Sequence, residues 1–212
     1  MNICHVVSLG TVEYETAWDI QKGTHQRVVA GELANVLLLL EHPHVYTLGR
    51  RGTVDDILIS PERLAELGAE VHRIDRGGEV TYHGPGQLVG YPIIDLRRWN
   101  GGALKYVRTL ERVLIDTLSE FGIHADREDR PTGVWVGDAK IAAIGVRIRR
   151  WVSYHGVSLN VAPDLDHYRG IVPCGIRDHG VTSLAALGVA ATMADVDAAL
   201  RRTFGDIFGV QD

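Results

Sequence analysis

The stretch Arg76–Gln87 reads RGGEVTYHGPGQ and places four glycines within ten positions. Because glycine has no side chain, it lets a ligand or a second backbone approach closely. The same stretch carries Arg76, Thr81, Tyr82 and His83, but neither the Gly-Lys-Ser/Thr ending of a phosphate-binding loop nor a dinucleotide-binding fingerprint. We interpret it as a ligand-binding loop, the alternative being a tight structural turn.

Apolar periodicity predicts the elements on either side of this loop. Spacings of three and four residues are typical of amphipathic helices, and alternation is typical of strands. The expected helices cover residues 12–32, 61–67, 103–121 and 194–208. The expected strands cover residues 34–40, 71–75, 88–96, 140–149 and 151–161, with a turn at 149–151. This mixture favours an α+β fold over a doubly wound parallel one: a single domain, residues 1–212, with a mixed β-sheet flanked by helices.

Local signals mark the ends of three helices. Pro61 suits the first turn of a helix and Gly68 suits its end. Gly122 stops the helix over residues 103–121. Thr192 is a candidate N-cap, with Asp195 three residues later as in a capping box.

Composition indicates a protein of a reducing compartment. The chain has 212 residues and a hydrophobic fraction of 45%, enough for a large core. Its two cysteines, Cys4 and Cys174, are far apart and form neither a disulfide framework nor a metal clip. The first ten residues lack the features of a signal peptide, and no apolar run approaches the ~20 residues of a membrane span. We therefore expect a cytoplasmic protein.

The charge argues against nucleic acid as a partner. The chain has 22 Lys and Arg against 27 Asp and Glu, a formal net charge of −5. Two local basic groups stand out against this background. They are Arg97, Arg98, Lys105, Arg108 and Arg112 in the first, and Arg147, Arg149 and Arg150 in the second. Each is either an ordinary solvated surface or a place where an acidic protein docks.

Cys174 stands in the motif IVPCGI, residues 171–176. A thiol is readily activated as a nucleophile, because a nearby cation lowers its pKa from the reference value of about 8.5. Cysteine is also among the most buried residue types, so a packing role stays open. For Cys4, in an apolar strand-like segment, we expect packing.

Other polar residues do not decide a function from their positions alone. Lys140 is typical of a solvated lysine at a strand end. His83 is either a ligand-binding or a hydrogen-bonded structural histidine. His42 and His44 lack a third ligand nearby, which predicts a loop and no metal site.

The loop and several further blocks carry a family resemblance. The stretch RGGEVTYHGPGQL, residues 76–88, is similar to the signature of the lipoyl(octanoyl) transferases, which belong to the biotin/lipoyl protein ligase fold. Further blocks follow the family's order along almost the whole chain. They are LLEHP (39–43), YTLGR (46–50), KIAAIGV (140–146), HG (155–156), LN (159–160) and VPCGI (172–176).

The resemblance implies an acyltransferase of lipoate synthesis. Such an enzyme takes an octanoyl (or lipoyl) group from acyl carrier protein, with octanoyl-acyl carrier protein as the donor, and places it on a lysine of a lipoyl domain. The implied acceptors are the lipoyl domains of 2-oxoacid dehydrogenases and the glycine cleavage H protein. An acyl carrier thioester is already activated, so such an enzyme needs no ATP. We also expect a monomer without a metal or other cofactor. The alternatives are an ATP-dependent lipoate–protein ligase, a non-catalytic acyl- or lipoyl-domain-binding module, and a thioesterase.

The resemblance also implies the site residues. Cys174 is the expected nucleophile, and Lys140 either stabilises its thiolate as an ammonium or takes a proton from the incoming lysine as a free amine. The expected acyl-binding residues are Arg76, Gly77, Gly78, Glu79, Val80, Thr81, Tyr82, His83, Ala143, Ile144, Gly145, Gly156, Val157 and Ser158. Val157 and Ser158 depart from the family's larger hydrophobe and Ala, a change that bears on chain-length preference.

Overall fold

The computed structural model contains two β-sheets. It describes residues 4–97, 99, 101–127, 131–172 and 180–209. The large, mixed sheet has the strand order β1-β2-β6-β9-β8-β10, and β7 pairs with β8 off this path. Its strands are β1 (Cys4–Thr11), β2 (Asn35–Glu41), β6 (Gln87–Ile93), β7 (Val134–Val136), β8 (Ala139–Arg149), β9 (Val152–Asn160) and β10 (Gly180–Val181). The small sheet has the order β4-β3-β5. Its strands are β3 (Val45–Leu48), β4 (Glu70–Arg73) and β5 (Val80–His83).

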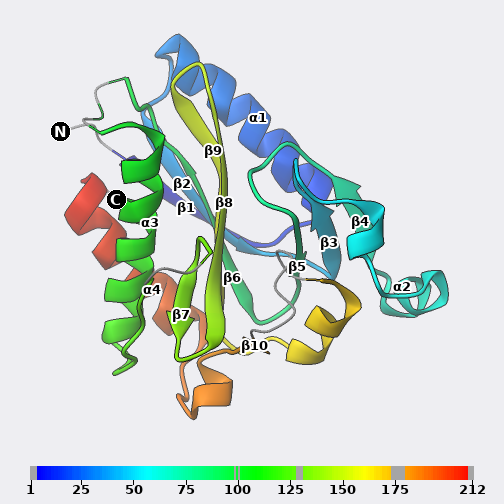
Figure 1. Ribbon diagram of the computed structural model, residues 1–212. Coiled ribbons are helices and arrows are strands. Elements are labelled where there is room, and N and C mark those ends of the chain that lie inside the picture. Colours follow the sequence, from blue (N-terminus) through cyan, green and yellow to red (C-terminus); the bar gives the residue numbers. More distant parts are fainter. Residues whose placement is uncertain (1–3, 98, 100, 128–130, 173–179, 210–212) are drawn as a thin grey trace.

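Helices cover both faces of the large sheet (Figure 1). Helix α1 (Tyr14–Ala30) lies on one face, and α3 (Gly102–Ser119) and α4 (Met193–Phe208) pack together on the other. Strand β2 runs between these layers, so its residues are buried on alternate sides and its sequence is one apolar run. The remaining helical segments are short. They are η1 (Val54–Asp56), α2 (Pro61–Leu67), η2 (Leu165–Gly170) and η4 (Ala185–Leu187).

The expected helix signals are confirmed. Helix α2 begins with Pro61 and ends at Gly68, whose φ of 60° is left-handed. Helix α4 has a capping box, in which the Thr192 side chain accepts from Asp195 N and the Asp195 side chain accepts from Thr192 N. Helix α3 ends at Ser119, shortly before Gly122.

The α+β class and the mixed sheet flanked by helices are confirmed as well. The β8–β9 hairpin turns at Arg150 and Trp151, which both have positive φ, 51° and 65°. The structure corrects one expectation: the stretch 76–87 is not a continuous loop, because β5 runs through its middle. Strands β3 and β5 have four residues each, too few for a periodic pattern to be recognised.

The small sheet is inserted between two neighbouring strands of the large one. Strands β2 and β6 are antiparallel partners, with Leu40 opposite Val89, and the chain between them forms β3, β4 and β5. At the base of this insertion Gly86 N donates to Glu41 Oε2 at 2.8 Å. Within the described residues, no helix is both long and apolar enough to cross a bilayer.

Candidate active site

A pocket lies between β5 of the small sheet and strands β8 and β9 of the large one. It encloses about 530 Å³, part of it open to solvent. The residues 76–78 lie across β8, because Gly77 N donates to Val146 O at 3.1 Å. The lining residues are Tyr14, Arg76, Gly77, Gly78, Val80, Thr81, His83, Tyr91, Thr132, Lys140, Ala143, Ile144, Gly145, His155, Gly156, Val157 and Ser158. The structure thus brings Lys140 together with every expected binding residue except Glu79 and Tyr82.

Two glycines allow the backbones to meet closely around this pocket. A Cβ on Gly145 would lie 2.9 Å from Gly77 O, where the loop crosses β8. A Cβ on Gly156 would lie 2.0 Å from Gly90 O of the neighbouring strand. Both contacts involve backbone atoms that cannot move aside easily, so a larger residue would displace a wall of the pocket.

Arg76 holds the loop in place. Its guanidinium is buried and donates through Nη2 to Thr47 O at 2.7 Å and to Thr47 Oγ1 at 2.9 Å. It also donates through Nη1 to Gly77 O at 3.0 Å. These bonds tie the loop to β3 of the small sheet.

The two expected residues outside the pocket lie elsewhere for clear reasons. Tyr82 packs with Tyr46 and Tyr168 in the core of the small sheet, and its hydroxyl is 2.7 Å from His44 Nδ1. Glu79 lies 3.8 Å from the Arg51 guanidinium. Alternation along β5 explains the position of Tyr82, since it points away from the face that carries Thr81.

His83 is held by a buried glutamine. Gln87 is fully buried, and its amide donates to Asn160 Oδ1 at 2.9 Å and to Tyr168 OH at 2.7 Å. Its Oε1 therefore accepts from His83 Nδ1 at 2.6 Å. Burial lowers the pKa of His83 to about 3, so its ring is neutral at pH 7 and its Nε2 carries a lone pair.

Lys140 stands at one end of the pocket. It lies on β8 between Trp135 of β7 and Val181 of β10. Its ammonium donates to Thr132 O at 3.4 Å and lies 4.7 Å from the centre of the Trp135 ring. The sequence-based expectation of a merely solvated lysine is therefore incomplete, since the side chain faces a cavity.

Cys174 lies outside the residues that the structure describes. On one side of its segment Val172 N donates to Asp56 O at 2.9 Å, and on the other side Val181 pairs with Lys140. Cys4 is fully buried in the core, and burial raises the pKa of its thiol to about 12. The prediction that Cys4 packs is confirmed.

Four lining residues were not predicted: Tyr14, Tyr91, Thr132 and His155. His155 was visible in the His-Gly block, but its place at the pocket depends on strand pairing. Tyr91 donates its hydroxyl to His42 Nε2 at 2.7 Å, because His42 Nδ1 donates to Val12 O at 2.6 Å.

His42 and His44 do not converge on one point. His42 bonds to Tyr91 and Val12, whereas His44 bonds to Tyr82. Within the described part of the chain, no group of three acidic, His or Cys residues is arranged to hold a metal ion.

Comparison with known proteins identifies the family. A model of the lipoyl protein ligase A/B catalytic domain matches residues 13–205. An octanoyltransferase of Solibacter usitatus is 50% identical over 98% of this chain and 94% of its own length. An octanoyltransferase of Caldicellulosiruptor saccharolyticus is 46% identical over 100% of this chain and 90% of its own length. The chain belongs to the octanoyltransferase family.

Solved structures show the fold of this octanoyltransferase-family chain. A putative lipoate protein ligase from T. acidophilum superposes with a TM-score of 0.79 at 17% identity, covering 99% of this chain and 87% of that one. A biotin protein ligase from Aquifex aeolicus gives a TM-score of 0.52 at 12% identity, covering 95% and 68%. The expected biotin/lipoyl protein ligase-like fold is confirmed.

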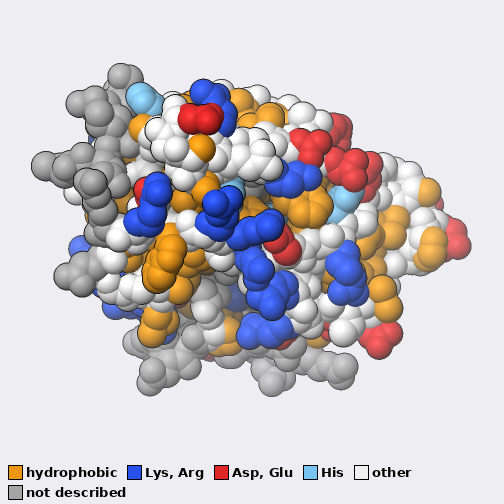
Figure 2. All heavy atoms as spheres, turned by 90° about the horizontal axis from the view of Figure 1, so that it is seen from above, with side chains coloured by type: hydrophobic (Ala, Val, Ile, Leu, Met, Phe, Trp, Pro, Cys, Tyr) orange, Lys and Arg blue, Asp and Glu red, His pale blue; other side chains and the backbone are white. Residues whose placement is uncertain are grey.

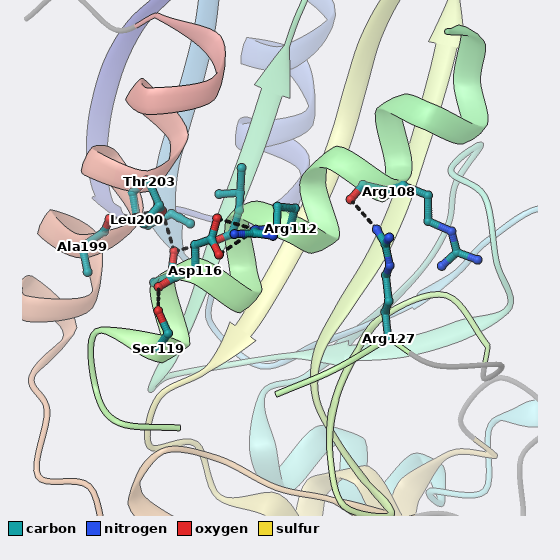
Figure 3. A network of polar contacts seen from close by, with 10 residues as sticks. Arg108, Arg112, Asp116, Ser119, Arg127, Ala199, Leu200 and Thr203 are labelled. Carbon is teal, nitrogen blue, oxygen red and sulfur yellow. Dashed lines mark hydrogen bonds and ion pairs between the residues drawn. The ribbon is translucent and has the colours of Figure 1, made fainter. Parts of the chain in front are cut away.

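The two basic groups of this family member differ in how far their charge is balanced. In the first group Arg98 lies outside the described residues. The ion pairs of the others are Arg97–Asp95, Arg108–Glu111 and Arg112–Asp116. Figure 3 shows the Arg112 side chain against Asp116, and Arg127 donating to Arg108 O at 3.3 Å. Nearby carboxylates thus balance much of this group's charge.

The second group is less balanced. Arg147 lies 3.8 Å from Asp75 Oδ2, but Arg149 and Arg150 are exposed at the β8–β9 turn and form no ion pair within the described residues. Figure 2 looks down on the end of the molecule that carries this turn and shows Lys and Arg side chains gathered across its middle. More of the positive charge is therefore left unbalanced at this end of the molecule.

Proposed function

We propose that this protein transfers an octanoyl group for protein lipoylation through a thioester formed on Cys174. The observation that carries the proposal is the pocket itself. It is largely apolar and lined by glycine-rich backbone, and Lys140 is one of its lining residues. An acyl chain fits such a pocket with its carbonyl at the Lys140 end.

In the first step the Cys174 thiolate attacks the carbonyl carbon of octanoyl-acyl carrier protein. A new C–S bond forms, the carrier's C–S bond breaks, and the carrier thiolate takes from Lys140 the proton that Cys174 has given to it, which leaves Lys140 as a free amine. One thioester replaces another, so the step is nearly balanced in free energy and needs no ATP. In the second step the ε-amine of an acceptor lysine attacks, an amide bond forms, and the Cys174 thiolate leaves. The amine's surplus proton passes to a base, for which Lys140 is the candidate.

Lys140 supplies the charge that the first step requires. At pH 7 an unperturbed thiol is only a few per cent ionised, and lowering its pKa by ~1.5 units makes it roughly half ionised. That shift is worth about 2 kcal/mol, which an ammonium close to the sulfur provides. The contacts to Thr132 and Trp135 hold the Lys140 ammonium at the pocket.

The same chemistry indicates which partners the protein has. The donor is octanoyl-acyl carrier protein, and the acceptors are lipoyl domains, including those of 2-oxoacid dehydrogenases and the glycine cleavage H protein. We propose that residues 1–212 act as one catalytic domain, as a monomer, in the cytoplasm. Octanoyltransferases at 43–50% identity favour this function over ATP-dependent ligation, since the ligase structures share only 17% identity or less.

Intact-mass measurement tests the proposal. The purified protein is incubated with octanoyl-acyl carrier protein, without ATP and without an acceptor, and any adduct is mapped. We expect one octanoyl group on Cys174, which moves to the lysine of an apo lipoyl domain when that domain is added. Transfer only after addition of ATP and free octanoate would support the ligase alternative instead.

Variants of Cys174 and Lys140 test the roles of the two proposed catalytic groups separately. Cys174→Ser should form no octanoyl-enzyme thioester, and Lys140→Met should slow transfer roughly a hundredfold or more while the protein stays folded. Lys105→Met, on the exposed face of α3, is the matched control and should transfer at the unaltered rate. An unaltered rate in Lys140→Met would contradict its role.

A further inference from the structure

A second cavity lies behind the pocket. It is a cleft of about 1000 Å³, part of it open to solvent, between α1 and the β8–β9 hairpin. Its lining residues are Trp18, Lys22, His25, Gln26, Val29, Ala30, Asp75, Arg149, Arg150 and Tyr154. None of these residues lines the first pocket, so the two cavities are separate.

Four side chains separate the two cavities, and we call them the partition: Trp18, Asp75, Tyr154 and His155. His155 faces the first pocket, and the other three line the cleft. His155 Nε2 donates to Asp75 Oδ1 at 2.9 Å, and the Tyr154 hydroxyl donates to Asp75 Oδ2. The Trp18 and His155 rings lie 6.1 Å apart, centre to centre. At His155 the partition is therefore two rings thick, with the His155 ring on the pocket side and the Trp18 ring on the cleft side.

The partition is held from several sides. His155 has a φ of 55°, a left-handed conformation in the middle of a strand, and its backbone N donates to Gln21 Oε1 at 2.9 Å. Its hydrogen bond lowers the pKa of Asp75 to about 2, so the carboxylate that holds the ring stays ionised at pH 7. The ring is thus fixed across the end of the pocket.

The partition lies at the opposite end of the pocket from Lys140. Lys140 and Val146 are six residues apart on β8, a separation of about 20 Å along the strand. Val146 is the strand partner of His155. An acyl chain with its carbonyl at Lys140 therefore points its terminal methyl group toward His155.

We propose that the partition sets the upper limit of acyl chain length, an inference that rests on the proposed octanoyl transfer. A chain that is too long meets the fixed His155 ring and cannot enter the cleft behind it. A single misplaced methylene in an apolar pocket is worth roughly 10- to 200-fold in kcat/KM. Removing the His155 ring extends the pocket toward the Trp18 ring, which gives the extra carbons room.

The test measures kcat/KM for octanoyl-acyl carrier protein and for donors of ten to sixteen carbons, because the ~20 Å along β8 exceeds the length of an extended octanoyl chain. We expect the unaltered protein to prefer octanoyl over the longest donors by roughly tenfold or more, and His155→Ala to bring them within roughly threefold. Trp18→Ala gives the His155 ring space to move into the cleft and should at least halve the preference. It is the deciding variant if His155→Ala does not fold. Gln26→Ala is the matched control, because Gln26 is an exposed residue that lines the same cleft and does not belong to the partition.

The outcomes are distinct. An unchanged preference in folded His155→Ala, or in Trp18→Ala where His155→Ala is unfolded, overturns the inference. Equal use of all donors by the unaltered protein, or a preference lost equally in Gln26→Ala, overturns it too. Failure of the unaltered protein to transfer octanoyl at all would instead refute the proposed function.

Discussion

Replacing Gln87 by methionine removes the hydrogen-bonded centre beside the pocket while nearly preserving the volume of the side chain. Gln87 is fully buried and joins β5 to β9 and η2 through His83, Asn160 and Tyr168. In the variant Asn160 Oδ1 still accepts from the Tyr168 hydroxyl at 3.1 Å, so these two remain bonded. The His83 Nδ1 hydrogen is left without its acceptor.

The expected cost follows from these contacts. Two amide hydrogen bonds are lost at about 1 kcal/mol each, and an unsatisfied buried N–H adds about 1 kcal/mol or more. We therefore expect Gln87→Met to lower the free energy of unfolding by about 3 kcal/mol. Because His83 is no longer held by its Nδ1, kcat of octanoyl transfer should fall as well.

Urea unfolding at pH 7 measures the effect, and an unchanged m-value shows that the free energy itself has changed. Gln26→Met, on the exposed side of α1, is the matched control and should stay within about 0.5 kcal/mol of the unaltered protein. A loss below about 1 kcal/mol in Gln87→Met would refute the reasoning, because it would mean that the His83 hydrogen finds another acceptor.

Three further changes test other parts of the structure. Gly156→Ala places a Cβ 2.0 Å from Gly90 O, so urea unfolding should show a loss of about 2 kcal/mol or more; a neutral result would contradict the close approach of the two strands. Asp75→Asn should cost about 1 kcal/mol at pH 7, a value reduced for the partial exposure of the carboxylate. The pKa of Asp75 is depressed from 3.8 to about 2, so this stability is present above pH 4 and is lost as the pH falls toward 2. The free energies of unfolding of Asp75→Asn and the unaltered protein should therefore converge near pH 2. A constant difference across this pH range would contradict a stabilising bond between Asp75 and His155. Thr192→Ala removes the N-cap of α4 and should cost about 1 kcal/mol in thermal or urea unfolding, whereas an unchanged stability would show that the capping box contributes little.

The long elements were predictable from the sequence because each carries its own periodic signal. Helix α1 buries Tyr14, Ala17, Gln21, His25 and Val28, the three- and four-residue spacing seen in the sequence. The β8–β9 hairpin alternates over enough residues for its pairing to be expected. The pairing of Arg112 with Asp116 was also within reach, since residues four apart face each other on a helix.

The remaining features depend on contacts between distant parts of the chain. Arg76 was expected at the acyl site, but its bonds to Thr47 span 29 positions and show that it also clamps the loop. The partition joins residues from α1, from the end of β4 and from β9. Nothing in the neighbourhood of His155 in the sequence indicates that its ring separates two cavities.

The insertion of the small sheet between β2 and β6 has a consequence for how this scaffold can be diversified. One wall of the pocket belongs to a continuous length of chain, whose two ends meet where Glu41 binds Gly86. The other wall belongs to the helix-covered sheet. One wall of the pocket is thus encoded by a single continuous segment, so we expect sequence changes confined to that segment to reshape this wall while β2 and β6 keep their pairing.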